Sequence, residues 1–246
     1  MLIFHNLLIY LRRNTNRMIK LLAIFLLGFS ISCSGSETDS LRHDTLMSTP
    51  GFRAMFKGGT SATMNSKGEV VEGVLAVDTD LWTTGPLVYF AAGYKIKINE
   101  LGQVFAGVSA VNFIAQACNG AFYEFQGKSP IAFDSGGRVI EGFLSQGAEF
   151  VTRDGVRFFS MPGTDVRFFP NGDIMRVTLS DTEKLSINKF EKIAFMAHHP
   201  VVFGYDGYVT QGTTAKKSTF VDSNGNSVVK QQGATVRFDS NGLLIE

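Results

Sequence analysis

The stretch Val166-Arg167-Phe168-Phe169-Pro170-Asn171-Gly172-Asp173-Ile174 (VRFFPNGDI) decides the fold of this chain of 246 residues. Apolar residues at Val166, Phe168 and Ile174 flank an Asn-Gly dipeptide, and this combination is a strong signal for a β-hairpin. Glycine suits such a turn because it adopts a positive φ angle without steric cost. The stretch therefore predicts two short antiparallel strands joined at Gly172.

The same pattern recurs through most of the chain at nearly constant spacing. The turn glycines follow one another at steps of 34, 35, 35, 35 and 35 residues: Gly68, Gly102, Gly137, Gly172, Gly207 and Gly242. The residues six before, four before and two after each of these glycines are apolar in every copy. Steps of two residues place them on one face of a strand. A fixed period of this length is the signature of a repeat architecture.

Two further glycine series subdivide each repeat. One lies 17 or 18 residues after the turn glycines and comprises Gly85, Gly120, Gly155 and Gly225. The other closes the repeat and comprises Gly59, Gly93, Gly127, Gly163 and Gly233. In the fourth repeat, Asn188-Lys189-Phe190 and His198-His199-Pro200 take their places. Each repeat of 35 residues is therefore predicted to contain two hairpins, or four short strands.

The short connections predict an all-β fold, since consecutive strands joined by tight turns lie antiparallel and adjacent. We expect tandem 35-residue hairpin repeats over 51–246 that form an open or solenoid-like antiparallel meander. An alternative is a closed β-propeller with a split blade, because 52–59 matches the end of a repeat and 234–246 matches its beginning. Propeller blades are usually nearer 40 residues or longer, which favours the open array.

The N-terminal segment has the layout of a secretory signal. The apolar run Leu21–Ile31 follows Arg17 and Lys20 and precedes Ser32-Cys33, which gives a charged region, an apolar core and a small-residue site. The core is shorter than the stretch of about 20 residues that a membrane span needs.

Within this segment, Ser30-Ile31-Ser32-Cys33 resembles the lipobox of bacterial lipoproteins. The resemblance implies cleavage before Cys33, acylation of that cysteine with palmitate-type chains, and Ser34 as a residue compatible with outer-membrane sorting. Residues 1–33 then form the signal segment, with either Met1 or Met18 as the start. Polar residues 34–50 are predicted to be a flexible tether to the repeat domain at 51–246.

Charge and cysteine count narrow the possible partners. Beyond residue 33 the chain keeps 19 of its 23 basic side chains, against 22 acidic ones. This balance lacks the basic excess that binding to a phosphate backbone requires, so nucleic acid is not expected as a partner. Cys118 is the only cysteine besides Cys33, so the acylated chain has no intramolecular disulfide.

Polar residues that suggest a metal site are better explained by turns. His198 and His199 are neighbours, and neighbouring side chains in a strand point to opposite faces. Asp222-Ser223-Asn224-Gly225-Asn226 and Asp239-Ser240-Asn241-Gly242 look like the start of a calcium loop but lack the glutamate at its twelfth position. We therefore expect no metal and no cofactor.

Candidate nucleophiles and acids are equally isolated. Cys118 lies beside a turn with no base near it in the sequence, and Ser145 and Ser160 lie in no nucleophile-elbow motif. Glu72 and Glu141 occupy one repeat position, four after the turn glycine, where other repeats have Ala106, Arg176 and Gln211. Such variation predicts a solvated strand position and no catalytic residue.

Aromatic residues cluster in the first two repeats: Trp82, Tyr89, Tyr94, Phe122 and Tyr123. Exposed aromatic side chains on a sheet could stack on sugars or bind a partner. Strand alternation places some of them inward, and we expect most to pack in the core.

The motif Phe-x-x-x-Gly-x-Val-x-x-Gly-x-Leu, as in Phe133 to Leu144, resembles bacterial MORN-type hairpin repeats over 52–246. The resemblance implies binding to lipid or protein, and no functional residue carries over. We expect a lipid-anchored envelope protein with a binding or structural role, whose partner is a protein or a glycan. One alternative is an envelope enzyme acting on a glycan or peptide at a site that combines Glu141, Asp154 or His198. Another is a surface adhesin.

Overall fold

The turn glycines lie in the tight turns of a 12-stranded antiparallel sheet, as the sequence predicts. The computed structural model describes residues 37–245, and over this range the chain forms 24 strands and no helix. All six turn glycines have a positive φ, between 74° and 90°. The predicted all-β fold of repeated hairpins is confirmed.

We call the 12-stranded sheet the long sheet. Five turn glycines, Gly68, Gly102, Gly137, Gly172 and Gly207, join ten of its strands in pairs, neighbouring pairs are hydrogen-bonded to each other, and one further strand lies at each end. In spatial order it comprises β1 (Glu37–Ser40), β4 (Ser61–Met64), β5 (Val70–Val74), β8 (Lys95–Ile98), β9 (Val104–Val108), β12 (Pro130–Phe133), β13 (Val139–Phe143), β16 (Asp165–Phe168), β17 (Ile174–Thr178), β20 (Pro200–Phe203), β21 (Val209–Thr213) and β24 (Thr235–Arg237).

Between consecutive pairs of long-sheet strands, the chain forms a separate two-stranded hairpin. We call these the outer hairpins, and each is a small sheet of its own. They pair β2 (Thr45–Ser48) with β3 (Arg53–Phe56), β6 (Thr79–Trp82) with β7 (Leu87–Phe90), β10 (Phe113–Gln116) with β11 (Phe122–Phe125), β14 (Glu149–Val151) with β15 (Arg157–Phe159), β18 (Glu183–Ser186) with β19 (Lys192–Phe195), and β22 (Ser218–Val221) with β23 (Ser227–Lys230).

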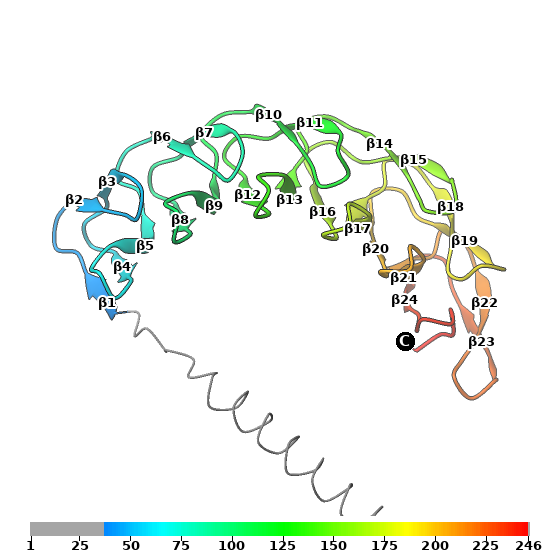
Figure 1. Ribbon diagram of the computed structural model, residues 1–246. Coiled ribbons are helices and arrows are strands. Elements are labelled where there is room, and N and C mark those ends of the chain that lie inside the picture. The colour runs from blue at the N-terminus through cyan, green and yellow to red at the C-terminus, as the bar shows by residue number, and fades with distance from the viewer. Residues whose placement is uncertain (1–36, 246) are drawn as a thin grey trace, which may run out of the picture. The chain divides into compact units, whose positions relative to one another are not determined.

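The chain therefore alternates between two layers, and the outer hairpins follow one another along one side of the long sheet (Figure 1). The core lies between the layers. Ile96 and Val104 of the long sheet and Phe90 of an outer hairpin are fully buried there, and their counterparts in the other repeats join them in one apolar cluster. Burial of a phenylalanine contributes about 2–3 kcal/mol, and this contribution recurs from repeat to repeat.

In four of the six outer hairpins, a phenylalanine packs against a glycine of the long sheet. An ideal Cβ added at Gly73, Gly107 or Gly142 would lie 2.7–2.8 Å from a ring carbon of Phe56, Phe90 or Phe125, in that order. Gly212 meets Phe195 in the same way. These glycines have no positive φ, so the fold requires them for space and not for backbone conformation.

The turn glycines also allow close packing between repeats. The turn of the β6–β7 hairpin lies against the turn that joins β12 to β13, and an added Cβ at Gly85 would lie 2.9 Å from the Cα of Gly137. Thr84 Oγ1 donates a hydrogen bond of 2.7 Å to the carbonyl of Asp134 in the same contact. The turns of the first five outer hairpins each lie against a long-sheet turn glycine of a later repeat in this way: Gly51 against Gly102, Gly85 against Gly137, Cys118 against Gly172, Arg153 against Gly207 and Asn188 against Gly242.

The third glycine series is shifted by one residue from its predicted place in the second repeat. Lys128, and not Gly127, has the positive φ (56°) there, and His198 (61°) occupies the equivalent place in the fourth repeat. With Gly59, Gly93, Gly163 and Gly233 these residues restore steps of 34 and then 35 residues. The backbone geometry of the turn is therefore retained where its glycine is lost.

The prediction of a flexible tether over 34–50 is wrong for Glu37–Ser48. Glu37–Ser40 forms β1, which pairs with β4, and Thr45–Ser48 forms β2, which pairs with β3. Backbone pairing explains this order, because β1 is exposed along its whole length and contributes little apolar burial. Leu41, between the two strands, is buried in the core. The repeat architecture therefore includes the strands at Glu37–Ser40 and Thr45–Ser48, before residue 51.

The long sheet is an open meander and does not close into a ring. A ring would bring Phe56 and Leu244 together, but Phe56 bridges to Leu75, and Leu244 bridges to Phe238 and Asp222. The closed β-propeller with a split blade is therefore excluded.

Candidate binding surfaces

One row of residues crosses the solvent-facing side of the long sheet from β1 to β24. Each residue of this row lies directly opposite the next on the neighbouring strand, and we call the row the cross-sheet row. In order it comprises Thr38, Thr63, Glu72, Lys97, Ala106, Ala132, Glu141, Arg167, Arg176, Val202, Gln211 and Arg237.

The sequence predicts five of the twelve residues of this row. Glu72, Ala106, Glu141, Arg176 and Gln211 occupy the repeat position that the sequence predicts to be solvated, and none of them is buried. Their opposite partners, which lie five residues before each turn glycine, were not singled out. The signal was present, because those partners alternate with the apolar residues six and four before the glycine.

Charged residues flank the middle of the row on both sides. On one side, Lys95 Nζ donates a hydrogen bond of 2.6 Å to Glu72, and Lys97 Nζ lies 3.7 Å from the same carboxylate. The hydrogen bond from Lys95, with the two positive charges, lowers the pKa of Glu72 against a smaller opposing effect of burial.

On the other side, Glu141, Arg167 and Arg176 of the row form a network with Asp165, which lies two residues before Arg167 on β16. Arg167 Nη2 lies 2.8 Å from Glu141, and Arg176 Nε lies 3.4 Å from Asp165, which also approaches Arg167 at 3.7 Å. Arg167 and Arg176 face each other across β16 and β17. Asp165 offsets the repulsion between them, since like charges directly opposite on a sheet are destabilising.

Between these charged groups lies a depression of about 390 Å³. Ala106 and Ala132 face each other at its floor, with Tyr94 at its margin and Lys97 and Glu141 on its two sides. The depression exists because two alanines occupy row positions where every other repeat has a larger side chain. An apolar hollow with a few polar groups at its margin is the usual form of a ligand site.

The outer hairpins form a second surface, which faces away from the long sheet. Inward residues such as Leu81 and Val88 are buried, so their neighbours along each strand point to solvent. The large apolar side chains exposed on these strands are Leu46, Trp82, Leu87, Tyr89, Ile114, Phe122, Val151, Phe159, Val221 and Val229.

The expectation that the clustered aromatic residues pack in the core is wrong for four of the five. Trp82, Tyr89, Tyr94 and Phe122 are exposed, with exposed fractions from 39% to 68%. Only Tyr123 packs inward, where its ring lies 5.4 Å from the ring of Phe150 and 6.4 Å from that of Phe168. Alternation alone could not assign these faces, because both faces of the first outer hairpins carry large apolar residues.

Cys118 is buried beside Asp134, and its Sγ lies 3.3 Å from Asp134 Oδ2. Burial, with the hydrogen bond to Asp134 and its negative charge, raises the pKa of Cys118 to about 11. A thiol with such a pKa is protonated at neutral pH and is a poor nucleophile. This agrees with its predicted role as a small core residue.

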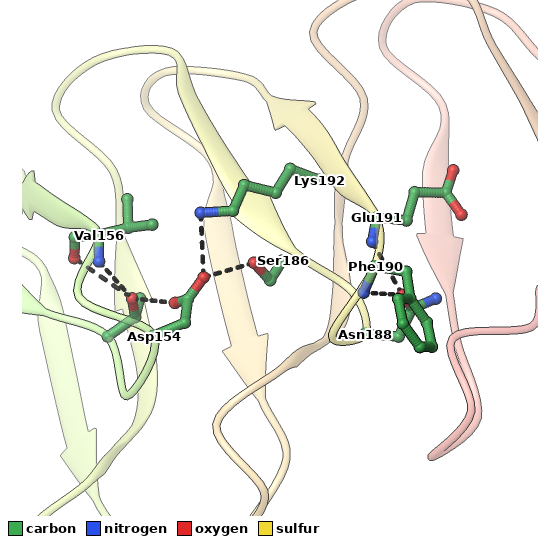
Figure 2. Close-up of polar contacts among 8 residues, drawn as sticks. Asp154, Val156, Ser186, Asn188, Phe190, Glu191 and Lys192 are labelled. Atoms are coloured by element: carbon green, nitrogen blue, oxygen red, sulfur yellow. Dashed lines mark hydrogen bonds and ion pairs between the residues drawn. The ribbon is translucent and has the colours of Figure 1, made fainter.

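Asp154 connects two outer hairpins (Figure 2). Ser186 Oγ donates a hydrogen bond of 2.6 Å to its Oδ2, Lys192 Nζ lies 3.1 Å from the same oxygen, and Thr152 Oγ1 donates to Oδ1. Burial acts to raise the pKa of Asp154, but these three donors outweigh it and lower the pKa to about 2. The carboxylate therefore stays ionised and joins the turn of β14–β15 to β18 and β19.

The turn between β18 and β19 departs from the glycine pattern of the outer hairpins. Asn188 Oδ1 accepts hydrogen bonds from the backbone N–H groups of Phe190 and Glu191 (Figure 2), and Lys189 Nζ lies 4.7 Å from the centre of the Phe190 ring. Phe190 is 87% exposed. Asn119 and Asp222 accept similar backbone hydrogen bonds in outer turns that keep their glycine, so this turn retains the side-chain contact and lacks only the glycine.

The remaining candidates have turn contacts. His199 Nδ1 lies 2.8 Å from the carbonyl oxygen of Ala197, and Asp222 Oδ1 accepts hydrogen bonds from the N–H groups of Asn224 and Asn226. Asp239 accepts the same pair of bonds in the last turn. Within residues 37–245, no cluster of three or more His, Cys, Asp or Glu side chains could hold a metal ion.

No known protein family matches this chain, and no curated protein matches it. The resemblances to MORN-type repeats and to the lipobox therefore stay predictions. Cys33 and the signal segment 1–33 lie outside the described residues. Among residues 37–245, no helix is long and apolar enough to cross a membrane.

Proposed function

We propose that this protein is a lipid-anchored binding protein of the bacterial cell envelope, and that it presents its long sheet to a protein or glycan partner. The observation that carries the proposal is the cross-sheet row with its central depression. A row held in register over twelve strands offers one continuous surface. Repeat proteins commonly bind along such extended surfaces.

The depression would be the centre of this surface. Ala106 and Ala132 supply apolar surface within the depression of about 390 Å³, and Lys97 and Glu141 place opposite charges on its two sides. Buried apolar contact at the centre with polar groups at the rim is the usual arrangement of an interface. Tyr94, 47% exposed at the margin, adds an aromatic contact, which suits a sugar ring or an apolar side chain equally.

Binding accounts for the polar residues better than catalysis does. An envelope hydrolase would need Glu141, Asp154 or His198 to act together. Glu141 pairs with Arg167, whereas Asp154 pairs with Lys192 and Ser186 of an outer hairpin. His198 lies in a turn with positive φ. An adhesin would use the same surface and differ only in its partner.

Blocking the depression tests the assignment of the surface. Ala132→Arg copies the residue that the next repeat has at this position, Arg167, so the sheet should tolerate it while the long side chain fills the depression. Full-length protein would be immobilised and exposed separately to solubilised envelope proteins and to an envelope glycan fraction. We expect Ala132→Arg to lose most of the partner retained by the unmodified chain.

The matched control is Leu101→Arg, which adds the same side chain at a turn residue that is 79% exposed. This variant should retain the partner. Equal retention by Ala132→Arg and the unmodified chain would contradict the proposed surface.

The anchoring part of the proposal rests on Cys33 and has a separate test. Cys33→Ala should release the protein from the membrane fraction of its bacterial host, because stable attachment needs the acyl chains of that cysteine. Metabolic labelling with a palmitate analogue should mark the unmodified chain and not the variant. Unchanged membrane partitioning and labelling would rule out lipidation at Cys33.

A further inference from the structure

The outer hairpins β6–β7 and β10–β11 carry the densest group of exposed apolar side chains. Trp82 faces Leu87 on the first hairpin, and Tyr89 lies on the same face. Ile114 and Phe122, both about two-thirds exposed, lie on the second hairpin. The N–H of Ala110 donates to the carbonyl of Tyr89 at 2.7 Å, which holds the start of the second hairpin beside the first.

Two carboxylates lie within this apolar group. Asp80 is directly opposite Tyr89, and Glu124 is directly opposite Ile114. Neither forms an ion pair with any residue in 37–245. Glu124 accepts hydrogen bonds from the neutral side chains of Ser145 and Gln146, so its negative charge is not neutralised. We call the seven residues Asp80, Trp82, Leu87, Tyr89, Ile114, Phe122 and Glu124 the acidic aromatic patch.

We infer that the acidic aromatic patch is a docking site for a cationic amphipathic polypeptide segment. Such a segment buries the exposed rings under its apolar face and brings lysine or arginine to Asp80 and Glu124. Aromatic residues supply much of the energy of protein interfaces, and complementary charge sets the choice of partner.

The negative charges of Asp80 and Glu124 argue against two other occupants of the patch, an anionic lipid surface and a second copy of the chain. An anionic lipid surface attracts basic segments, and it would repel the two unpaired carboxylates. A second copy of the chain, docked patch to patch about a two-fold axis, would place its Asp80 and Glu124 close to the same carboxylates of the first copy, and these like charges would repel. A cationic polypeptide has neither conflict.

This site is separate from the long-sheet surface, because the patch residues point away from that sheet. The two surfaces can therefore be tested independently, and a negative result for one surface does not contradict the proposal for the other. Together they would let the protein bridge two partners.

Trp82 gives a direct readout, because it is the only tryptophan in the sequence and is 63% exposed. Full-length protein would be titrated with a synthetic peptide of about 15 residues, with Leu on one helical face and Lys on the other. The expected result is a shift of Trp82 emission to shorter wavelength that saturates and weakens with added salt. The same peptide with Glu in place of Lys should cause no shift.

Two variants and one control locate the effect. Phe122→Ser removes apolar contact, and Asp80→Asn with Glu124→Gln removes the charges at constant shape; each should weaken peptide binding at least about 10-fold. Val229→Ser removes an exposed apolar residue from the last outer hairpin, β22–β23, and should leave binding unchanged.

Four results would overturn the inference. These are an equal response to the Glu peptide, no shift with either peptide, a Trp82 shift with phosphatidylglycerol vesicles in place of the peptide, and a shift that depends on protein concentration alone. The third would assign the patch to a membrane, and the fourth to self-association.

Discussion

The second and third repeats solve the same packing problem in opposite ways. In the second, the large ring of Phe125 lies on Gly142 of the following repeat, whose missing side chain makes room for it. In the third, the equivalent positions 35 residues later are Ser160 and Val177, both buried. The large residue of the pair therefore lies in the outer layer in one case (Phe125) and in the long sheet in the other (Val177). The small residue, Ser160, directly follows outer strand β15.

This exchange shows that the repeat conserves the volume between its layers and not the identity of each residue. Protein cores tolerate hydrophobic substitutions when total volume is kept. Phe56 with Gly73, Phe90 with Gly107, and Phe195 with Gly212 use the first solution. Residues in this pair of positions are therefore coupled, and changing one alone should be costly in either repeat.

The largest effect is expected where a side chain is added under a ring. In Gly142→Val, the new Cβ would lie 2.7 Å from Phe125 and 2.9 Å from the Ile131 side chain, both buried. Overpacking of this kind costs about 3 kcal/mol. Chemical denaturation monitored by circular dichroism should show a lower midpoint. A midpoint equal to that of the unmodified chain would mean that Phe125 moves freely, contrary to a shared volume.

The second prediction converts the third repeat to the solution of its neighbours. Ser160→Phe alone should destabilise by about 2–3 kcal/mol, because the ring meets Val177 and the hydrogen bond from the Ala148 N–H to Ser160 Oγ is lost. Val177→Gly alone should cost about 2 kcal/mol by leaving a cavity.

The double variant Ser160→Phe/Val177→Gly completes the cycle. We expect it to be more stable than the sum of the single effects by about 2 kcal/mol, within the range measured for residues in contact. Strict additivity would contradict the coupling that the comparison of the two repeats implies.

The third prediction separates the two reasons for a turn glycine. Gly172 and Gly120 both have a positive φ, but an added Cβ at Gly172 would lie 2.6 Å from the carbonyl oxygen of Cys118, whereas nothing lies within 4 Å of one at Gly120. Gly120→Ala should therefore cost only about 1 kcal/mol of backbone strain. Gly172→Ala should cost about 1–2 kcal/mol more. Equal losses would show that the contact between repeats has room to relax.

Local signals explain why the repeat could be predicted from the sequence. Two of these signals act within one hairpin: the Asn171-Gly172 dipeptide and the apolar alternation of Val166 and Phe168. They predict a tight turn between antiparallel strands, and the structure confirms it. The separation into two layers was not predictable in the same way, because it depends on which hairpins pair with one another. Gly142 illustrates the difference. A glycine is required there because the ring of Phe125, which belongs to the other layer, lies against it, and the sequence alone does not reveal that contact.

The candidate surfaces also contain some features that local sequence predicts and others that depend on contacts between hairpins. The solvated position of Glu72 and Glu141 followed from repeat alignment. The depression did not, because it depends on Ala106 and Ala132 facing each other across two hairpins. Exposure of Trp82 also needed the structure, since Leu81 beside it is equally apolar and only the layer arrangement decides which of the two is buried.

The smallest predicted effect concerns Asp154, which connects the third repeat to the fourth through Ser186 and Lys192. The equivalent residue of the second repeat, Asn119, instead donates a hydrogen bond to Tyr123 within its own hairpin. Because its pKa is lowered from 3.8 to about 2, ionised Asp154 stabilises the fold above pH 4, and this contribution is lost as pH falls from about 4 to about 2.

Asp154→Asn should therefore cost about 1 kcal/mol at pH 7, a value reduced for the partial exposure of the ion pair. At pH 2 the variant and the unmodified chain should have nearly equal stability, since most of the advantage of the charged form is then gone. Thermal unfolding of both chains at pH 7, 4 and 2 measures this. Asp80→Asn is the control, because Asp80 forms no ion pair with any residue in 37–245. A stability difference that stays constant over this pH range would mean that the carboxylate charge does not connect the two hairpins.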